Sequence, residues 1–106
     1  MADSQVRERK QAERIVVEII RATGVHETTS IDGSDWVHET EVLIGADLLD
    51  TVDLRNGRLM LVDDVGHAKN LPDNPEATAL YHNICKPGTT HRIRGDVVIG
   101  KDTDFA

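Results

Sequence analysis

The sequence predicts a single α+β domain in which four strands and two helices follow one another in the order β-α-β-β-α-β. Three observations lead to this prediction: an alternating apolar run at residues 15–20, an Asn-Gly pair between two further alternating runs, and an apolar stripe of helical spacing at residues 77–84. A chain of 106 residues has the length of one domain. The simplest way to bury these stripes is a mostly antiparallel four-stranded sheet with two helices packed on one face, a ferredoxin-like order.

The first third of the chain is expected to contribute one strand. Residues 1–14 have a helix-forming composition but no apolar stripe, so we expect a polar N-terminal arm or a solvated helix. Residues 15–22 alternate apolar side chains and predict a strand that is buried mostly on one side. Residues 23–33 are polar and interrupted by glycine, which is typical of a loop.

A helix and a hairpin are expected next. Ser34 or Asp35 can cap a helix that ends at Gly45. Residues 48–54 and 59–62 then predict two strands, of which the second is apolar on both faces and therefore central.

The connection between these two strands carries a strong turn signal. Asn56-Gly57 lies between two alternating runs, and this pair favours a tight hairpin turn because both of its residues tolerate positive φ.

A second helix and a last strand complete the domain. Asn74 can cap a helix whose first residue is Pro75, because proline lacks the N–H that would have no partner there. Residues 97–99 predict a short strand between two glycines. Residues 15–101 thus form the single α+β domain, and residues 102–106 form a tail.

Composition and charge narrow the function classes. The net charge is −7, and no Lys or Arg occurs between Arg21 and Arg55, where eight acidic residues fall. Because binding to phosphate backbones needs clustered cations, we expect no direct nucleic-acid binding. The first residues lack the apolar segment of a secretory signal, no run is long enough to cross a membrane, and the lone Cys85 excludes an internal disulfide. These features favour a cytoplasmic protein without membrane contact.

The stretch rich in acids suggests a binding surface for a protein partner with a basic surface. Most such runs are a solvated face, and the sharper interpretation is a surface that imitates nucleic-acid phosphates and occupies a basic cleft. The candidate residues of this acidic face are Asp35, Glu39, Glu41, Asp47 and Asp50.

The loop at residues 87–91 is the alternative candidate site. Its glycine and hydroxyl side chains could hold a small ligand or nucleotide through Thr89, Thr90 and His91. A lysine placed as in a phosphate-binding loop is absent, and turn hydrogen bonds explain the threonines equally well.

Zinc is the third alternative, as a structural ion or in a hydrolase. His67, His82, Cys85 and His91 are residue types that bind zinc, but their spacing matches no standard site. A buried cysteine and surface histidines account for the same residues, so we expect no convergence on one ion. We assign no catalytic residue and no cofactor.

Motifs in the second half of the chain carry a resemblance. They are the run at residues 59–66, the Leu71-Pro72-x-Asn74-Pro75 segment and the Gly95-Asp96-Val97-Val98 segment. On these motifs, residues 45–100 resemble a widespread bacterial family of domains of unknown function that is also common on plasmids and phages. The resemblance implies a small α/β fold and a mobile-element setting, and it implies no reaction.

Together these observations favour a non-enzymatic accessory protein of mobile elements. We expect it to act as an acidic inhibitor or decoy of a host nucleic-acid or defence enzyme. The alternatives are the ligand-binding module using residues 87–91 and the zinc-stabilised domain or hydrolase. Whether the chain also forms a homo-oligomer is left open by the sequence.

Overall fold

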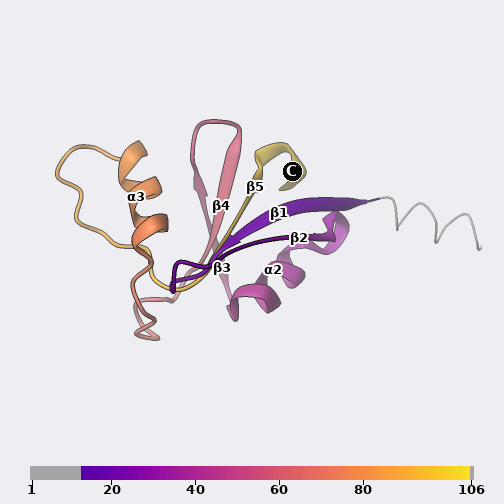
Figure 1. Cartoon of the computed structure of the whole chain (residues 1–106), viewed down its shortest axis with the longest axis horizontal. Coiled ribbons are helices and arrows are strands. Elements are labelled where there is room, and N and C mark those ends of the chain that lie inside the picture. The colour runs from indigo at the N-terminus through magenta and orange to yellow at the C-terminus, as the bar shows by residue number, and fades with distance from the viewer. Residues whose placement is uncertain (1–12, 106) are drawn as a thin grey trace, which may run out of the picture.

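A computed structural model describes residues 13–105 of the chain, and its centre is a five-stranded antiparallel sheet in the order β2-β1-β5-β4-β3. Two helices accompany the sheet (Figure 1). The elements in chain order are β1 (Arg14–Ile20), β2 (His26–Asp32), the 3-10 helix η1 (Gly33–Asp35), α2 (Trp36–Ile44), β3 (Leu49–Asp53), β4 (Arg58–Asp63), α3 (Pro75–Ile84), β5 (Val97–Lys101) and the 3-10 helix η2 (Asp102–Phe105). The α+β class is confirmed, whereas the prediction of four strands is wrong. Most of the predicted N-terminal arm, residues 1–12, lies outside the described residues.

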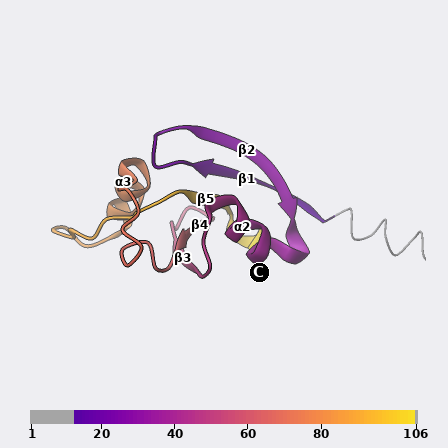
Figure 2. The ribbon, with the colours of Figure 1, turned by 90° about the horizontal axis from the view of Figure 1, so that it is seen from below.

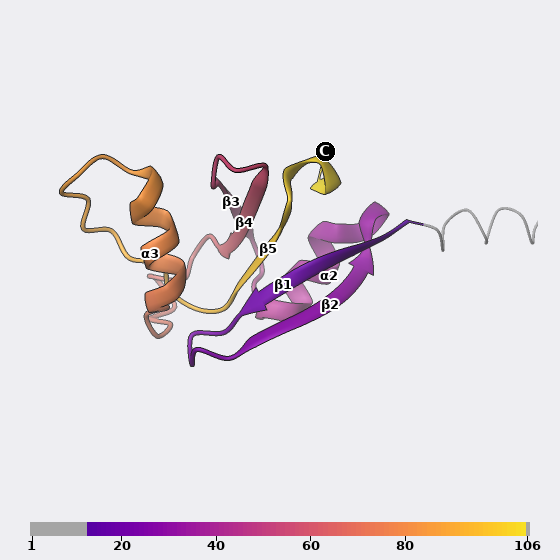
Figure 3. The same ribbon diagram turned by 45° about the horizontal axis from the view of Figure 1, so that its top comes forward.

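The two helices cover opposite faces of the sheet. Alternate residues of a strand point to opposite faces, and the core divides along this alternation. Leu61 of β4 belongs to the cluster that contains Ile44 of α2, whereas its neighbours Met60 and Val62 belong to the cluster that contains Ala77 of α3. In Figures 2 and 3, α3 and α2 accordingly lie apart, with strands between them. The prediction that both helices pack on one face is therefore wrong.

The additional strand is β2, in the segment that was expected to be a loop. It pairs antiparallel with β1 along its whole length, and the turn between the two strands contains Gly24 at φ +95°. Only Ile31 of this strand is buried. A strand at the edge of a sheet needs little apolar alternation, and two adjacent threonines favour extended backbone. Because the sequence of β2 is mostly polar, this strand was not predicted.

The predicted hairpin of β3 and β4 is confirmed, with a different turn. The strands pair antiparallel, and Leu54 N donates to Arg58 O over 3.0 Å. Residues 55–57 form a three-residue loop with positive φ at Arg55 (70°) and Gly57 (74°). The prediction of positive φ at both Asn56 and Gly57 is thus right for the glycine alone.

Helix α2 ends as predicted but begins differently. Gly45 takes φ +68°, and Ala46 N donates to Glu41 O over 2.9 Å, which is a glycine-terminated helix end. Asp35 makes no side-chain capping hydrogen bond. Instead, the side chain of Asp32 accepts from Ser34 N at 2.9 Å and caps the short helix η1 that leads into α2.

Helix α3 begins as predicted, and its cap also links three parts of the fold. Asn74 Oδ1 accepts from Ala77 N at 3.1 Å, which confirms the cap. Its amide nitrogen donates to Ile20 O at 3.0 Å and to Gly95 O at 2.9 Å. Only 1% of Asn74 is exposed. One buried amide therefore fixes the start of α3 against the end of β1 and the segment before β5.

Residues 102–105, expected as part of a tail, form η2 and return to the core. Phe105 is buried, and its ring centroid lies 5.0 Å from that of Trp36 in an edge-to-face arrangement. This contact closes the core beneath α2. Within residues 13–105, no helix combines the length and the apolar character needed to cross a membrane.

Candidate functional site

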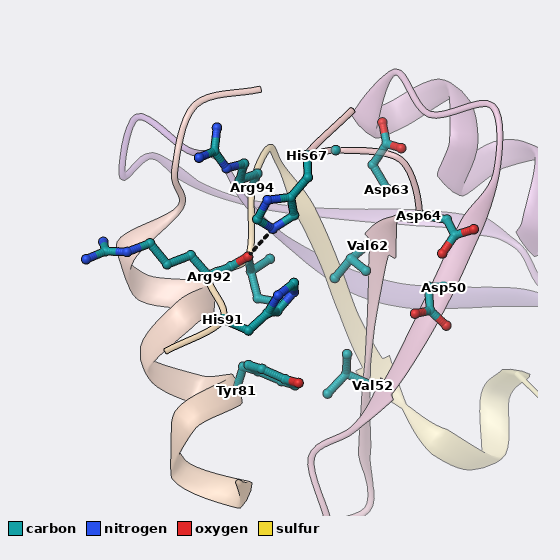
Figure 4. A pocket seen from close by; sticks show the side chains of 12 residues that line it. Asp50, Val52, Val62, Asp63, Asp64, His67, Tyr81, His91, Arg92 and Arg94 are labelled. Atoms are coloured by element: carbon teal, nitrogen blue, oxygen red, sulfur yellow. Dashed lines mark hydrogen bonds between the residues drawn. The ribbon is translucent and has the colours of Figure 1, made fainter. Parts of the chain in front are cut away.

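A cleft of about 270 Å³ lies between the α3 side of the molecule and the β3–β4 hairpin (Figure 4). Its lining combines rings, valines, carboxylates and arginines drawn from three separate parts of the chain. The lining residues are Asp50, Val52, Val62, Asp63, Asp64, Gly66, His67, Tyr81, His91, Arg92, Ile93 and Arg94.

Three rings form one wall of the cleft. The ring centroids of His67 and His91 are 4.8 Å apart, and those of Tyr81 and His91 are 5.6 Å apart. Hydrogen bonds to the backbone fix this wall: His67 Nε2 lies 2.8 Å from Arg92 O, and His82 Nε2 lies 2.6 Å from His91 O. The wall is therefore held by tertiary contacts between α3 and two loops.

The opposite wall carries exposed carboxylates above an apolar floor. Asp50 pairs with Val62 across the β3–β4 ladder, so its side chain shares the cleft-facing side of the sheet with Val52. Asp50 and Asp64 are exposed, and neither makes an ion pair with another residue of the described range 13–105. Asp50 Oδ1 accepts a hydrogen bond from Thr51 N at 2.9 Å, but the negative charge of both carboxylates has no ion-pair partner among these residues.

Asp63 has a structural role beside them. Its side chain is 1% exposed, and Oδ2 lies 2.6 Å from Lys69 Nζ. Its Oδ1 accepts from Val65 N at 2.9 Å. A buried carboxylate with both oxygens engaged stabilises the turn after β4 and is not available to a ligand.

The two arginines of the lining turn away from the carboxylates. Arg92 Nη1 and Arg94 Nε each lie 3.5 Å from an oxygen of Asp73. Arg94 Nη1 also donates to Asn70 Oδ1 and to Leu71 O, both at 3.2 Å. In Figure 4 both guanidinium groups point to the side opposite Asp50 and Asp64. The cleft thus presents a negative wall rather than a mixed one.

The phenol of Tyr81 lies close to this negative charge. Its pKa is raised, first by its interaction with the Cys85 thiol and further by burial and by the Asp50 carboxylate. In Figure 4 the Tyr81 hydroxyl points across the cleft towards Val52 and the strands. Tyr81 therefore stays a neutral hydrogen-bond donor at physiological pH.

The predicted acidic face divides between the two sides of the sheet. Four of its members surround α2: Asp35 and Glu39 are one helical turn apart, and Glu41 and Asp47 line a hollow of about 370 Å³ beside the helix. Asp50 lies on the other side of the sheet, in the ring-walled cleft. The five residues therefore do not form one surface.

The predicted ligand loop contributes one residue to the cleft. His91 belongs to the ring wall, whereas the Thr89 hydroxyl donates to Lys86 O at 2.8 Å within its own turn, and Thr90 is exposed outside the lining. Tyr81 was expected only as part of the apolar stripe of the second helix, and Asp64 was not among the predicted site residues. A tyrosine on the apolar stripe of a helix gives no sequence signal that its ring borders a cleft.

The four weak candidates for zinc ligands do not come together at one site. His67 and His91 stack against each other, His82 contacts a backbone oxygen, and Cys85 lines a different hollow with Leu80. Over residues 13–105 the structure contains no group of three or more histidine, cysteine or acidic side chains that could hold a metal ion.

The comparisons with known proteins add no identification. Protein-family models, curated proteins and solved structures contain no match to this chain. The resemblance of residues 45–100 to a bacterial domain family therefore stays a prediction from its motifs, and the fold and the two surfaces described above are the basis for any functional conclusion.

Proposed function

We propose that this chain is a non-enzymatic binding protein and that the surface around α2 binds a basic surface on a partner protein. The observation that carries the proposal is the coincidence of two exposed valines and two half-buried glutamates on this helix with exposed aspartates beyond its two ends, Asp35 and Asp47. Val37 is 45% exposed and Val42 is 67% exposed. Val37 and Glu41 lie one turn apart, as do His38 and Val42. Binding interfaces commonly combine such apolar contacts with a charged rim.

Shallow hollows flank this ridge and would receive side chains of the partner. Val42 and His38 border both of them, one of about 370 Å³ with Glu41 and Asp47, and one of about 240 Å³ with Glu39 and residues of β2. Each hollow thus has an acidic border and an apolar side. Basic side chains with long apolar stems fit this combination.

The cations that reach α2 are already paired. Arg21 Nη1 donates to Leu43 O at 2.9 Å and Lys69 Nζ donates to Gly45 O at 3.1 Å, at the helix end where positive charge is favourable. Arg21 is paired with Glu27 and Asp96, and Lys69 is paired with Asp63. Among residues 13–105, no cation forms an ion pair with Glu39, Glu41 or Asp47.

The sequence resemblance suggests the class of partner. If the chain belongs to a mobile element, a host enzyme that acts on nucleic acids would offer the basic cleft that an acidic surface can occupy. Electrostatic attraction would make association fast at low salt and slower as ions screen the exposed charges.

The test is a comparison of matched charge reversals. Glu41→Lys with Asp47→Lys should abolish capture of partners from a bacterial lysate, and the captured, identified protein should then bind the purified wild-type chain with an association rate that falls with salt. Asp50→Lys, on the other side of the sheet, is the control and should bind normally. Full binding by the α2 double variant would refute the proposal.

A further inference from the structure

The cleft between α3 and the β3–β4 hairpin has a chemistry that the surface of α2 lacks. It offers a wall of rings, an apolar floor and two carboxylates that form no ion pair with any other residue of the described range 13–105. We propose that this cleft binds the guanidinium group of an arginine side chain from a partner protein.

The ring wall favours a flat cation. A guanidinium group stacks on the face of an aromatic ring, where it is attracted by the electrons of the ring. Tyr81 and His91 lie edge to face at an interplanar angle of 71°, so they present ring surfaces in two directions. A backbone hydrogen bond holds the His67 ring in place, and the His82 side chain holds the backbone of His91, so less freedom is lost when a ligand stacks against the wall.

The carboxylates select positive charge. Asp50 and Asp64 project from the strand side of the cleft, opposite the rings (Figure 4). Carboxylate oxygens accept the paired N–H groups of a guanidinium, a geometry that the compact ammonium of lysine cannot reproduce. The same charges repel a phosphate, and the two arginines that could have attracted one are paired with Asp73.

The size of the cleft points to a side chain rather than to a whole ligand. Its volume of about 270 Å³ lies below the roughly 300–1,000 Å³ of pockets that enclose small molecules. Free arginine would bring its own carboxylate near Asp50 and Asp64, whereas an arginine within a polypeptide carries no charge on its backbone. We therefore assign the guanidinium to a protein partner.

This site is independent of the proposed binding surface on α2, because the sheet separates them. A partner that covers α2 would not fill the cleft, and the loss of one site would leave the other intact. The two proposals can therefore fail separately.

The first experiment uses capped tripeptides and the full chain. A peptide with arginine between two glycines should shift the NMR resonances of the Val52 and Val62 methyl groups and of the Tyr81 ring. The isosteric citrulline peptide, which lacks the charge, should leave them unshifted, and the lysine peptide should bind more weakly. Equal binding of the citrulline and arginine peptides, or of free L-arginine and the arginine peptide, would overturn the assignment.

The second experiment uses variants on the surface of the cleft. Asp50→Asn and Asp64→Asn should each lower the affinity of the chain for the arginine peptide by roughly two- to fivefold. This change corresponds to the loss of one exposed ion pair. Tyr81→Phe should retain more affinity than Tyr81→Leu, because only phenylalanine keeps the ring. Asp102→Asn is the matched control and should bind as wild type, because this exposed carboxylate of η2 lines neither the cleft nor the hollows beside α2. Unchanged affinity in the Asp50→Asn/Asp64→Asn double variant would refute the site.

Discussion

Arg21 Nη1 lies 3.0 Å from Asp96 Oδ2, and this contact joins the segment after β1 to the residue before β5. The same guanidinium binds Glu27 of β2 through Nε at 2.8 Å and the carbonyl oxygen of Leu43 in α2. Asp96 Oδ1 also accepts from Ala22 N at 2.8 Å. The hydrogen bonds with Glu27 and Asp96 raise the pKa of Arg21 above its ordinary value, so the guanidinium group is charged at physiological pH. One side chain thus connects two adjacent strands, a third strand and a helix end.

Replacement of Arg21 should therefore destabilise the fold measurably. We expect Arg21→Met to lower the free energy of unfolding by about 1.5–3 kcal/mol, because Asp96 and the Leu43 carbonyl lose a charged donor. Urea denaturation of the full chain measures the change. Arg92→Met is the control: its side chain is 64% exposed and its ion pair spans 3.5 Å, so it should cost less than about 1 kcal/mol. Equal losses in the two variants would contradict the role of Arg21.

Asn74 allows a test that separates a helix cap from a buried tether. Asn74→Ala should cost about 2–4 kcal/mol, because it removes the cap and leaves the carbonyls of Ile20 and Gly95 without their donor. Asn74→Ser keeps a capping oxygen but loses the amide N–H groups, so its cost should be intermediate. Thermal or urea melts check both values. A serine variant as stable as wild type would show that the cap alone matters.

His26 should make stability depend on pH near neutrality. Its Nε2 lies 2.6 Å from Glu76 and its Nδ1 lies 3.1 Å from Glu18, and these contacts raise its pKa above the ordinary value of 6.5, with Glu76 the larger cause. A raised pKa stabilises the folded state fully at a pH below 6.5, and this contribution disappears as the pH rises through the folded-state value.

Melting temperatures measured below and above the pKa of His26 in the folded state test this pH dependence. The wild type should lose stability on the alkaline side relative to His26→Gln, whose stability should change less over the same window. An NMR titration in which His26 titrates at or below its ordinary pKa would contradict the ion pairs.

Gly100 is predicted to admit no larger residue while Phe105 is in place. A Cβ atom at Gly100 would lie 2.7 Å from the Phe105 ring, so Gly100→Ala must displace that ring from its present position. We expect a loss of about 1–3 kcal/mol, typical of overpacking. Because Trp36 is the only tryptophan of the chain and contacts Phe105, its fluorescence should report the displacement.

A double variant separates this clash from a backbone effect. Phe105→Leu replaces the ring that meets the new methyl group with a shorter side chain. Gly100→Ala should therefore lower the free energy of unfolding less in the Phe105→Leu background than in the wild type. If the stability losses of the two single variants simply add in the double variant, the destabilisation by Gly100→Ala arises from the backbone of β5 instead.

Local chemistry made most elements predictable. Asn74 and Pro75 identify the start of α3 because capping and a missing N–H act within one helical turn. Gly45 identifies the end of α2 for the same reason, since left-handed backbone is a local requirement. The strands with alternating apolar residues were also found, and the structure confirms the antiparallel pairing of β3 with β4.

What the sequence concealed depends on long-range contacts. Strand β2 exists because β1 offers a complete ladder of partners, and its own side chains give almost no apolar signal. The face of the sheet on which each helix packs also depends on long-range contacts. Helix α3, for example, is held on its face by hydrogen bonds from Asn74 to the backbone of Ile93 and Gly95. The cleft joins Asp50 to Tyr81 and His91, which no spacing rule relates.

The position of β5 determines when the fold can be completed during synthesis. It is the last strand along the described chain, yet it lies between β1 and β4 at the centre of the sheet. The segments of the β1–β2 and β3–β4 hairpins therefore leave the ribosome before the strand that joins them, and their inner edges have no partner in this sheet until residues 97–101 emerge. Unpaired edges of this kind attract other strands. We therefore expect the nascent chain to be most exposed to aggregation just before β5 is released.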